Sequence, residues 1–495
     1  MKSFNIISFI STIILIALFS SGCKRKTDGP YFATGIKIGE VTAHSSILWV
    51  RLTSDSLPAS TENPFPLIRY IDPETNEYVE EFRKSRDAYT PEIAYPDGFD
   101  LYSIEGATRG IPGDVMAYYK PVNTQHWEST VWMPVDTTKD FTVRIHLGGL
   151  SPGTRYEIRV ISRYPKSKAI GESITGEFKT APDPELPAEI LFTVSTGQAY
   201  ADQDAPEGGF KIYNQMLRLT PDFFVHTGDI VYYDEYAKNL DLARWHWSRT
   251  YSLPTNRRFH RKVASYFLKD DHDTWLNDCW PGMESRFMGD FTFEQGQRVF
   301  LEQVPMAEKT YRTYRWGKDL QIWLMEGRDF RSPNNLSDSD QKTIWGRKQK
   351  EWLKTTVTSS DATFKILISP TPIVGPDREN KLDNYSNSNF SHEGNEIRSF
   401  IKGVDRMYVV CGDRHWQYIS VDDETGIREY SCGPASDQHA GGWTNEMYMP
   451  EHRYLNVTGG FLAGKVMRIE TQPILVFYHY SVDGYILNAD TLQSN

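Results

Sequence analysis

The hydrophobic pattern of the chain changes at a proline-rich segment, residues 182–187. Before it, runs such as 35–52 and 156–163 alternate apolar and polar residues, which predicts half-buried β-strands separated by turns. After it, continuous apolar runs alternate with segments that carry apolar residues at helical spacing, as is typical of buried strands and the helices that cover them. Prolines stiffen such a connection and end both helix and strand. The pattern therefore predicts an N-terminal β-sandwich domain followed by an α/β layered sandwich domain.

The predicted α/β domain begins with a β-α-β unit. Residues 190–195 form an apolar run, residues 209–219 have apolar positions at helical spacing, and residues 221–228 form the next apolar run. Further elements follow, with strands at 320–326, 364–369 and 407–411 and a helix at 348–356. In such folds the carboxyl ends of parallel strands meet at one edge of the sheet, where ligands bind.

The predicted sandwich contains a long insertion, residues 58–132, which is rich in proline, tyrosine and tryptophan and is expected to pack on another part of the molecule. Within it we expect 110–119 to be a surface loop, with a loop that reaches the second domain as the alternative. The sequence of 149–156, Gly-Leu-Ser-Pro-Gly-Thr-Arg-Tyr, resembles the penultimate-strand turn of fibronectin type III modules, and 176–182 resembles their last strand. These resemblances imply a fibronectin-like domain at 31–182 and an α/β domain at 188–485.

The first 23 residues resemble a bacterial lipoprotein signal. Lys2 supplies positive charge, residues 6–19 are apolar, and small residues precede Cys23. Ser20 departs from the leucine usual in that pattern, and an ordinary signal peptide or an uncleaved anchor is the alternative. In the lipoprotein interpretation Cys23 is acylated and tethers the protein to a membrane in the cell envelope, outside the cytoplasm.

Composition limits the classes of partner. The chain has 495 residues, of which 39% are hydrophobic, so it has sizeable cores and is not a disordered protein. Its net charge of −11 argues against a nucleic-acid-binding module, because phosphate backbones are bound through clustered lysine and arginine. The oligomeric state is left open.

The remaining cysteines have two interpretations each. Cys411 and Cys432 would pair if their strands are neighbours in an oxidising compartment. Cys279 would then be free, and we expect it to be a small buried hydrophobic residue, with a soft metal ligand as the alternative.

Ionisable side chains follow three of the apolar runs, and the small and polar residues 195–198 end a fourth. Asp229 follows one run with Tyr232 three residues on, and Asp413, Arg414 and His415 follow another. The segment 270–278, Asp-Asp-His-Asp-Thr-Trp-Leu-Asn-Asp, is dense in oxygen and imidazole donors, the mixture suited to hard divalent or trivalent cations. The sequence therefore predicts a metal site where the strand ends meet. Two ions that share an aspartate activate water and clamp a phosphoryl group.

These motifs resemble those of the PhoD-type alkaline phosphatase and phosphodiesterase family, within the calcineurin-like metallophosphoesterases. The segment 226–232 is similar to His-x-Gly-Asp-Tyr-Ile-Tyr, 270–273 with Asn277 to Asp-Asp-His-(Asp/Glu) and its trailing asparagine, and 412–415 to Gly-Asp-x-His. The resemblance implies an extracytoplasmic, metal-dependent hydrolase of phosphomonoesters or phosphodiesters, whose substrate is a small phosphoester or a phosphorylated polymer.

The resemblance also implies roles for single residues. Asp229 would bridge two metals, Tyr232 would bind ferric iron as a phenolate, and Asn277 and Asp413 would bind calcium, with Asp271 in the same segment as a further ligand. His415 would orient or protonate near the phosphate. The remaining candidates are Arg414 and His272 as catalytic residues, and Arg328, Arg331 and His439 as substrate-binding residues whose charge or position suits phosphate capture.

One motif departs from the family. The family reads Ser-Cys-Gln where this chain has Ser195-Thr196-Gly197-Gln198, so a thiolate ligand is missing. Asp202 and Asp204 are the expected replacement ligands, ahead of Cys279, and they favour calcium or another hard ion. The cofactors we expect are divalent or trivalent metals, namely calcium with or without iron. Two alternatives stay open, namely a lipoprotein that uses the scaffold to bind an anionic or phosphorylated glycan without turnover, and a hydrolase or lyase of another ester.

Overall fold

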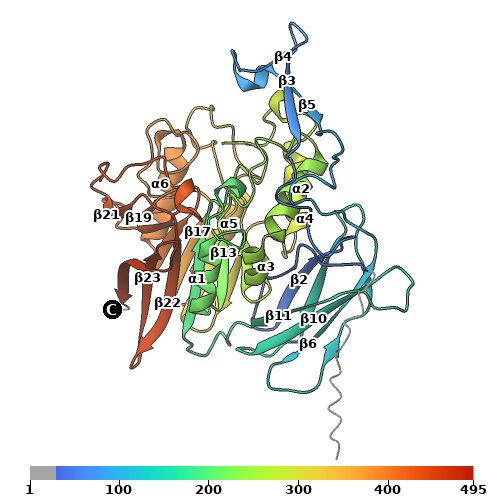
Figure 1. The fold of residues 1–495 in the computed structure, drawn as a ribbon. Helices are drawn as coiled ribbons and strands as arrows, with labels where there is room; N and C mark the ends of the chain where they lie inside the picture. The colour runs from blue at the N-terminus through green and yellow to red at the C-terminus, as the bar shows by residue number, and fades with distance from the viewer. Residues whose placement is uncertain (1–28, 494–495) are drawn as a thin grey trace, which may run out of the picture.

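The computed structural model describes residues 29–493, so the predicted signal and its Cys23 lie outside the described residues. Figure 1 shows an elongated N-terminal β-structure beside a larger layered body. Among the described residues, none of the helices combines the length and the apolar character needed to cross a membrane.

The N-terminal part is a β-sandwich, as the alternating pattern predicts. Its hydrophobic core joins both sheets through side chains such as Leu48, Ile145 and Val160. One sheet contains β1 (Ile36–Gly39), β2 (Ser45–Arg51) and β9 (Thr142–Gly148), and the other contains β11 (Ser173–Lys179), β10 (Arg155–Arg163), β6 (Asp114–Pro121), β7 (Glu128–Ser129) and β8 (Met133–Pro134).

The expectation of a surface loop at 110–119 is wrong, because most of this segment belongs to β6. That strand pairs with β10 from Asp114 to Pro121, and its Val115 and Ala117 are buried in the sandwich core. The glycines and proline at 110–113 end before the strand, whereas the following residues alternate between the core and the outer face.

The insertion carries a small three-stranded sheet that projects from the body in Figure 1. The part of the insertion that follows this sheet packs on α2 (Leu240–Ser252), since Ile104 and Ala107 share a hydrophobic cluster with Leu242 and Trp245. The strands are β3 (Leu67–Asp72), β4 (Glu77–Val79) and β5 (Thr90–Ala94), with a short 3-10 helix, η1 (Arg86–Ala88), after β4.

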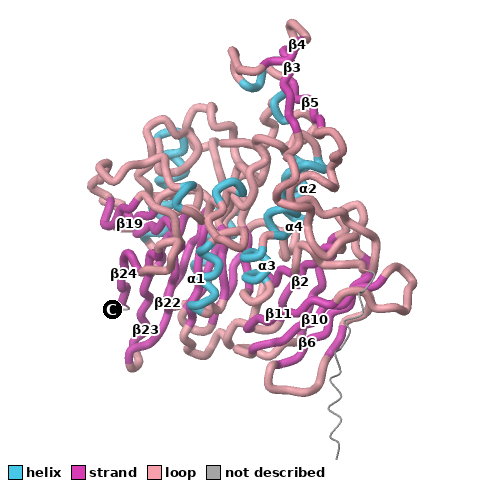
Figure 2. The backbone as a smooth tube through the Cα atoms, viewed as in Figure 1, coloured by secondary structure: helices cyan, strands magenta, loops and turns pink. Residues whose placement is uncertain are grey.

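The second part has two sheets packed face to face with helices outside them, as Figure 2 shows. The first sheet contains β24 (Ile486–Gln493), β23 (Gln472–Tyr480), β22 (Phe461–Ile469), β12 (Ile190–Ser195), β13 (Phe223–His226) and β14 (Ala264–Phe267) in that order. The second contains β15 (Arg312–Trp316), β16 (Leu320–Leu324), β17 (Phe364–Ser369), β18 (Met407–Cys411), β20 (Arg428–Cys432), β19 (Gln417–Val421) and β21 (His452–Asn456). This is the predicted layered α/β sandwich.

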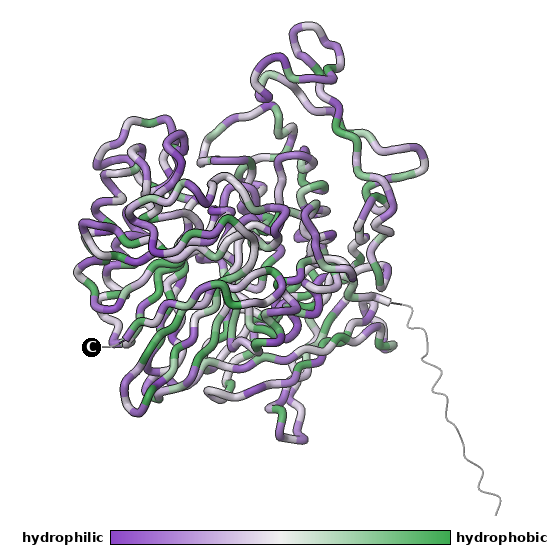
Figure 3. Tube along the Cα trace, turned by 60° about the vertical axis from the view of Figure 1, so that its left-hand side comes forward, coloured by the Kyte–Doolittle hydropathy of each residue, from purple (hydrophilic) through white to green (hydrophobic). Residues whose placement is uncertain are grey.

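Hydrophobic residues concentrate along the strands, as Figure 3 shows, and each outer face is covered by helices. Ile212 and Phe259 pack against Phe224 on the outer face of the first sheet, and Leu353 and Ile397 pack against Leu367 on the second. The helices are α1 (Lys211–Leu219), α2 (Leu240–Ser252), α3 (Pro254–His260), α4 (Phe293–Gln303), α5 (Gly346–Thr358) and α6 (Ser391–Lys402), with the 3-10 helices η2 (Tyr200–Asp202), η3 (Arg286–Met288), η4 (Ser388–Phe390) and η5 (Asp437–His439).

The sandwich and the α/β part share a sheet. Gly39 of β1 lies opposite Ser265 of β14 in a parallel pairing, so β1, β2 and β9 extend the first sheet to nine strands. A Cβ atom at Gly39 would lie 2.7 Å from the carbonyl oxygen of Ser265, so this close approach requires glycine. The predicted boundaries at 31–182 and 188–485 stay predictions.

The possible disulfide is absent from the described chain, where Cys279, Cys411 and Cys432 are free and buried. The strands of Cys411 and Cys432 are neighbours, but Cys411 lies opposite Ser431 in the parallel pair. Successive residues of a strand point to opposite faces, so Cys432 lies in the core between the sheets while Cys411 packs with Trp416 outside. Cys279 is packed in a hydrophobic cluster, as expected for a small buried hydrophobic residue.

Candidate metal centre

Glycines allow the loops after the strands to approach one another closely. A Cβ atom at Gly228, just before Asp229, would lie 2.6 Å from the Cβ atom of Asp270. In the same way, a Cβ atom at Gly412, just before Asp413, would lie 2.6 Å from Oγ1 of Thr227. Larger residues at these two positions would force the loops apart. The Gly-Asp pairs therefore bring carboxylates from β13, β14 and β18 to one place.

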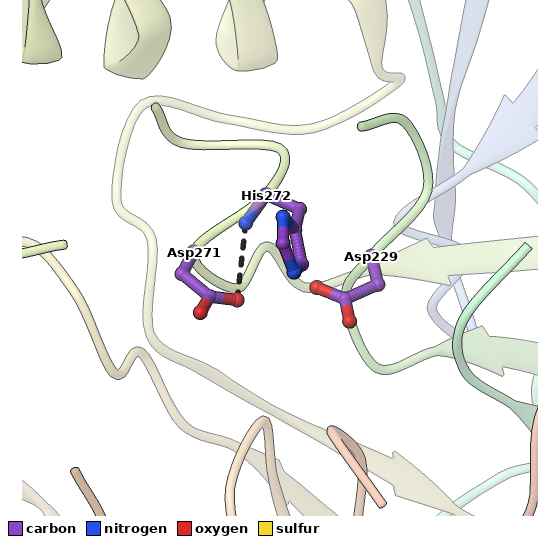
Figure 4. Close-up of side chains that lie close together, drawn as sticks. All are labelled: Asp229, Asp271 and His272. Carbon is purple, nitrogen blue, oxygen red and sulfur yellow. Dashed lines mark hydrogen bonds between the residues drawn. The ribbon is translucent and has the colours of Figure 1, made fainter. Parts of the chain in front are cut away.

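The candidate metal site is a cluster of three residues, Asp229, Asp271 and His272. Their potential ligand atoms all lie within 4.8 Å of one another, and Figure 4 shows His272 between the two carboxylates. His272 Nδ1 lies 2.5 Å from Asp234 Oδ2, which fixes the ring and leaves Nε2 for another partner. The backbone N–H of His272 donates to Asp271 Oδ1 over 3.0 Å.

The electrostatics of this cluster favour a bound cation. Burial and the carboxylates of Asp271 and Asp270 raise the pKa of Asp229 well above its ordinary value, although His272 opposes the shift. Burial lowers the pKa of His272, but Asp234 and Asp271 outweigh burial and the net shift is well upward. In the described chain Asp229 Oδ1 and His415 Nε2 are buried and have no hydrogen-bond partner. Because unpaired buried acceptors are costly, this donor set fits a metal ion.

A second group of donors lies beside Asp229. The Tyr232 hydroxyl is 3.3 Å from Asp229 Oδ2 and 2.6 Å from His439 Nε2. His415 Nε2 is 3.8 Å from Asp229 Oδ2, and the centroids of its ring and the His439 ring are 4.1 Å apart. The structure thus brings together three residues that the sequence proposed for different roles.

Asp229, His272 and His415 line a pocket of about 510 Å³. Two cations, Arg378 and Lys381, belong to its wall, and Lys381 Nζ lies 2.7 Å from Asp278 Oδ1. Sequence analysis missed both, because their loop between β17 and η4 follows no motif, and its only signal is two cations three residues apart. The other lining residues are Asp229, His272, Asn277, Asp278, Asn380, Asp413, His415, Trp416, Gly441 and Gly442.

The three arginines proposed as catalytic or substrate-binding residues are buried and are not among the residues that line the pocket. Arg328 is fully buried, with Nε 2.5 Å from Asp270 Oδ1 and Nη2 3.7 Å from Asp271 Oδ2. Arg331 is buried and donates to Asn334 Oδ1 and to the carbonyl oxygen of Asp383. Arg414 is fully buried and pairs with Asp377 over 2.6 Å and with Asp413. Arg328 therefore holds carboxylates, Arg331 holds an amide and a backbone carbonyl oxygen, and neither is among the residues that line the pocket.

The expected replacement ligands lie apart from each other. Asp202 Oδ2 is 2.8 Å from His439 Nδ1, so it reaches the site through that ring. Asp204 accepts a hydrogen bond from the backbone N–H of Lys211 at the start of α1. Cys279 Sγ lies 3.7 Å from the carbonyl oxygen of Asp271, and Cys279 packs in a hydrophobic cluster.

Comparison with known proteins gives the family whose profile the chain matches and solved structures with a similar fold. The profile of the PhoD-like phosphatase family matches residues 192–456. No curated protein matches the chain. The solved structure of PhoD is similar over 93% of this chain and 89% of that chain, with a TM-score of 0.67 and 15% identity. Purple acid phosphatase PPD1 from yellow lupin (Lupinus luteus) seeds is similar over 91% of this chain and 79% of that chain, with a TM-score of 0.57 and 14% identity. The two structures share the fold of this chain.

Proposed function

The chain belongs to the PhoD-like phosphatase family, and on that premise we propose that it is a metal-dependent phosphoric ester hydrolase acting on phosphomonoesters or phosphodiesters. The observation that carries the proposal is the cluster of Asp229, Asp271 and His272 beside a pocket that also contains Lys381 and Arg378. Carboxylates and imidazole suit the metal, and the two cations suit the phosphate.

The metal-binding residues we propose supply oxygen and nitrogen donors in one small volume. Asp229 belongs to the cluster with Asp271 and His272 and also lies 3.3 Å from the Tyr232 hydroxyl, whose ring packs against that of His272. Asn277 and Asp413 line the same pocket. Bound metal ions supply Lewis-acid polarisation of the phosphoryl group and lower the pKa of water. The ions we propose are calcium with or without iron.

The remaining residues would bind and orient the substrate. Lys381 and Arg378 would hold phosphate oxygens against the metal cluster, Lys381 as a point charge and Arg378 as a planar fork. His415 lines the pocket near Asp229 and would orient the phosphate or exchange a proton with the leaving oxygen. Arg414 would act on this step by holding Asp413 in place.

We expect Lys381→Met to lower kcat/KM for an aryl phosphate by about 10- to 100-fold, mainly through KM. A hydrogen bond to a charged group contributes about 1.5–3 kcal/mol, and Met keeps the length of the side chain while it removes the charge. Steady-state kinetics measure the effect. Lys348→Met is the matched control, since Lys348 is exposed on α5. An unchanged KM in Lys381→Met would remove Lys381 from phosphate binding.

A second candidate function is binding of an anionic or phosphorylated glycan without turnover. It is favoured by the Ser195-Thr196-Gly197-Gln198 sequence, which lacks the cysteine of the family motif. An assay of the metal-loaded protein with an aryl phosphomonoester and a bis-aryl phosphodiester distinguishes the enzyme from the glycan-binding protein. Hydrolysis of either substrate supports the enzyme, and metal-dependent glycan binding without hydrolysis supports the second candidate.

We also propose that the protein is held on the extracytoplasmic side of a membrane by a lipid at Cys23. This rests on the lipoprotein-like pattern of the first 23 residues, which lie outside the described part of the chain. Membrane fractionation of cells that make the full chain tests it, and recovery in the soluble fraction would contradict it.

A further inference from the structure

We propose that His439 is a metal ligand held in position by Asp202, and that it completes a second ion site with Asp229, Tyr232 and His415. The inference rests on the proposed function, because it concerns the metal centre of the same pocket. It assigns His439 to the metal, whereas its position in the chain had suggested a substrate contact. It also assigns His415 to the metal, in place of the orienting or proton-exchanging role given to it above.

The donor atoms around the Tyr232 hydroxyl lie close together. The Tyr232 oxygen is 2.6 Å from His439 Nε2 and 3.3 Å from Asp229 Oδ2, and His415 Nε2 is 3.8 Å from Asp229 Oδ2. Ligand bonds of about 2.1 Å place neighbouring donors about 3 Å apart around an ion. The distances from the Tyr232 oxygen to His439 Nε2 and Asp229 Oδ2 lie around this value. His415 Nε2 is farther from Asp229 Oδ2, so coordination by both histidines requires their side chains to shift toward Asp229.

The orientation of His439 is the one that ligand imidazoles have. Asp202 Oδ2 lies 2.8 Å from Nδ1, so the carboxylate keeps the proton on Nδ1 and leaves the lone pair of Nε2 directed toward Tyr232. Metal-binding histidines almost always donate their other ring N–H to such a carboxylate or carbonyl partner. Asp202 is therefore a positioning residue that acts through His439.

The polar groups around Tyr232 have too few protons to satisfy each other. A phenol has one O–H donor, yet the Tyr232 oxygen faces both the Nε2 lone pair and the Asp229 carboxylate. In the part of the chain that the structure describes, Asp229 Oδ1 and His415 Nε2 are also buried without a hydrogen-bond partner. A cation satisfies all of these acceptors at once, which a substrate contact at the rim would not.

Gly197 leaves the space that this arrangement needs. A Cβ atom there would lie 3.3 Å from His439 Cδ2 and 3.4 Å from His415 Nε2. These contacts are tight, so a side chain at 197 would press on both imidazoles. Because glycine has no side chain, the His415 and His439 rings lie 4.1 Å apart between centroids. His415 follows β18 and His439 follows β20.

The donor types indicate which ion binds here. Two imidazoles, a phenol and one carboxylate favour a first-row transition metal over calcium, which prefers an all-oxygen set. For the other ion, Asp271 and Asn277 supply oxygen donors beside Asp229, together with the imidazole of His272. We therefore expect two ions of different preference that share Asp229.

The test measures metal rather than turnover. Full-length protein is stripped of metal and titrated with Co²⁺, whose visible spectrum reports nitrogen ligands, for wild type, His439→Ala, Asp202→Asn and Gln438→Ala. Gln438 is the exposed neighbour of His439 and is the matched control. We expect Asp202→Asn to weaken Co²⁺ binding by about 10- to 100-fold. We expect a larger loss and a changed spectrum in His439→Ala, and no change in Gln438→Ala.

Each outcome bears on the assignment. Wild-type Co²⁺ affinity and spectrum in a folded His439→Ala would overturn it, and so would loss of turnover by that variant with its metal retained. If Co²⁺ binds as expected and no phosphoester is hydrolysed, the metal assignment stands and the proposed function fails. Elemental analysis of the protein as purified checks that the His439-dependent ion is present before stripping.

Discussion

Asp229→Asn is expected to lower phosphoester turnover by about 10³-fold or more. The change removes the carboxylate shared by both groups of donors, and Lewis-acid catalysis contributes several kcal/mol, of which each 1.4 kcal/mol or so is a factor of about ten in rate. Initial rates on an aryl phosphodiester, measured beside metal content, check this. Rate and bound metal should fall together.

The same variant should not be less stable than wild type when both are metal-free. Burial and nearby carboxylates oppose the charge of Asp229, so asparagine relieves repulsion while it keeps an oxygen near the Tyr232 hydroxyl. Thermal denaturation separates loss of chemistry from loss of fold. Asp423→Asn, at an exposed aspartate, is the matched control for the change of charge. Near-normal turnover in Asp229→Asn would remove Asp229 from the centre of the site.

Arg328→Met is expected to destabilise the protein by about 3–5 kcal/mol, the cost of leaving a buried ion pair without one partner. Arg328 is fully buried beside Asp270, Asp271 and Asp383, with its Nη2 3.6 Å from Asp383 Oδ2. Without the guanidinium these carboxylates repel one another in a dry interior. The denaturation midpoint of the metal-free protein measures the effect.

Two further variants make this prediction specific. Arg347→Met removes an exposed arginine that pairs with Glu351 on α5, and it should change stability by less than about 1 kcal/mol. Adding Asp270→Asn to Arg328→Met should recover part of the lost stability, because it removes one unpaired charge. An Arg328→Met protein as stable as wild type would show that Arg328 does not neutralise the cluster.

The parts of the fold that could be predicted are those where a local sequence pattern is typical of a single kind of element. The continuous apolar runs at 364–369 and 407–411 are β17 and β18 to the residue, because strands buried on both faces carry little but apolar side chains. The Gly-Asp sequences at 228–229 and 412–413 marked strand ends correctly, and parallel topology then brought them together.

Other features depend on register and burial, which a local pattern does not contain. Strand β6 was hidden by the glycines and proline that precede it, and the pairing of Cys411 with Cys432 is excluded by a register that places Ser431 opposite Cys411. A charged residue near a strand end looks the same in the sequence whether its side chain lines the pocket or is buried in an ion pair. That is why Arg328 was assigned to the substrate and Lys381 was missed.

The structure also changes which residue could replace the missing cysteine of the first motif. Sequence alone favoured Asp202 as a direct replacement ligand. In the structure its carboxylate reaches His439, on a loop more than two hundred residues away, and that imidazole lies among the donors. Long-range contacts of this kind leave no spacing pattern in the chain.

The central claim is that metal ions bound around Asp229 hydrolyse phosphoesters, and removal of metal tests it most directly. Turnover of an aryl phosphodiester and metal content are measured on wild-type protein as purified, after dialysis against a chelator, and after addition of calcium, iron or both. The account predicts that turnover disappears with the metal and returns when one of these additions refills the site. Undiminished hydrolysis by protein shown to be free of metal would contradict it.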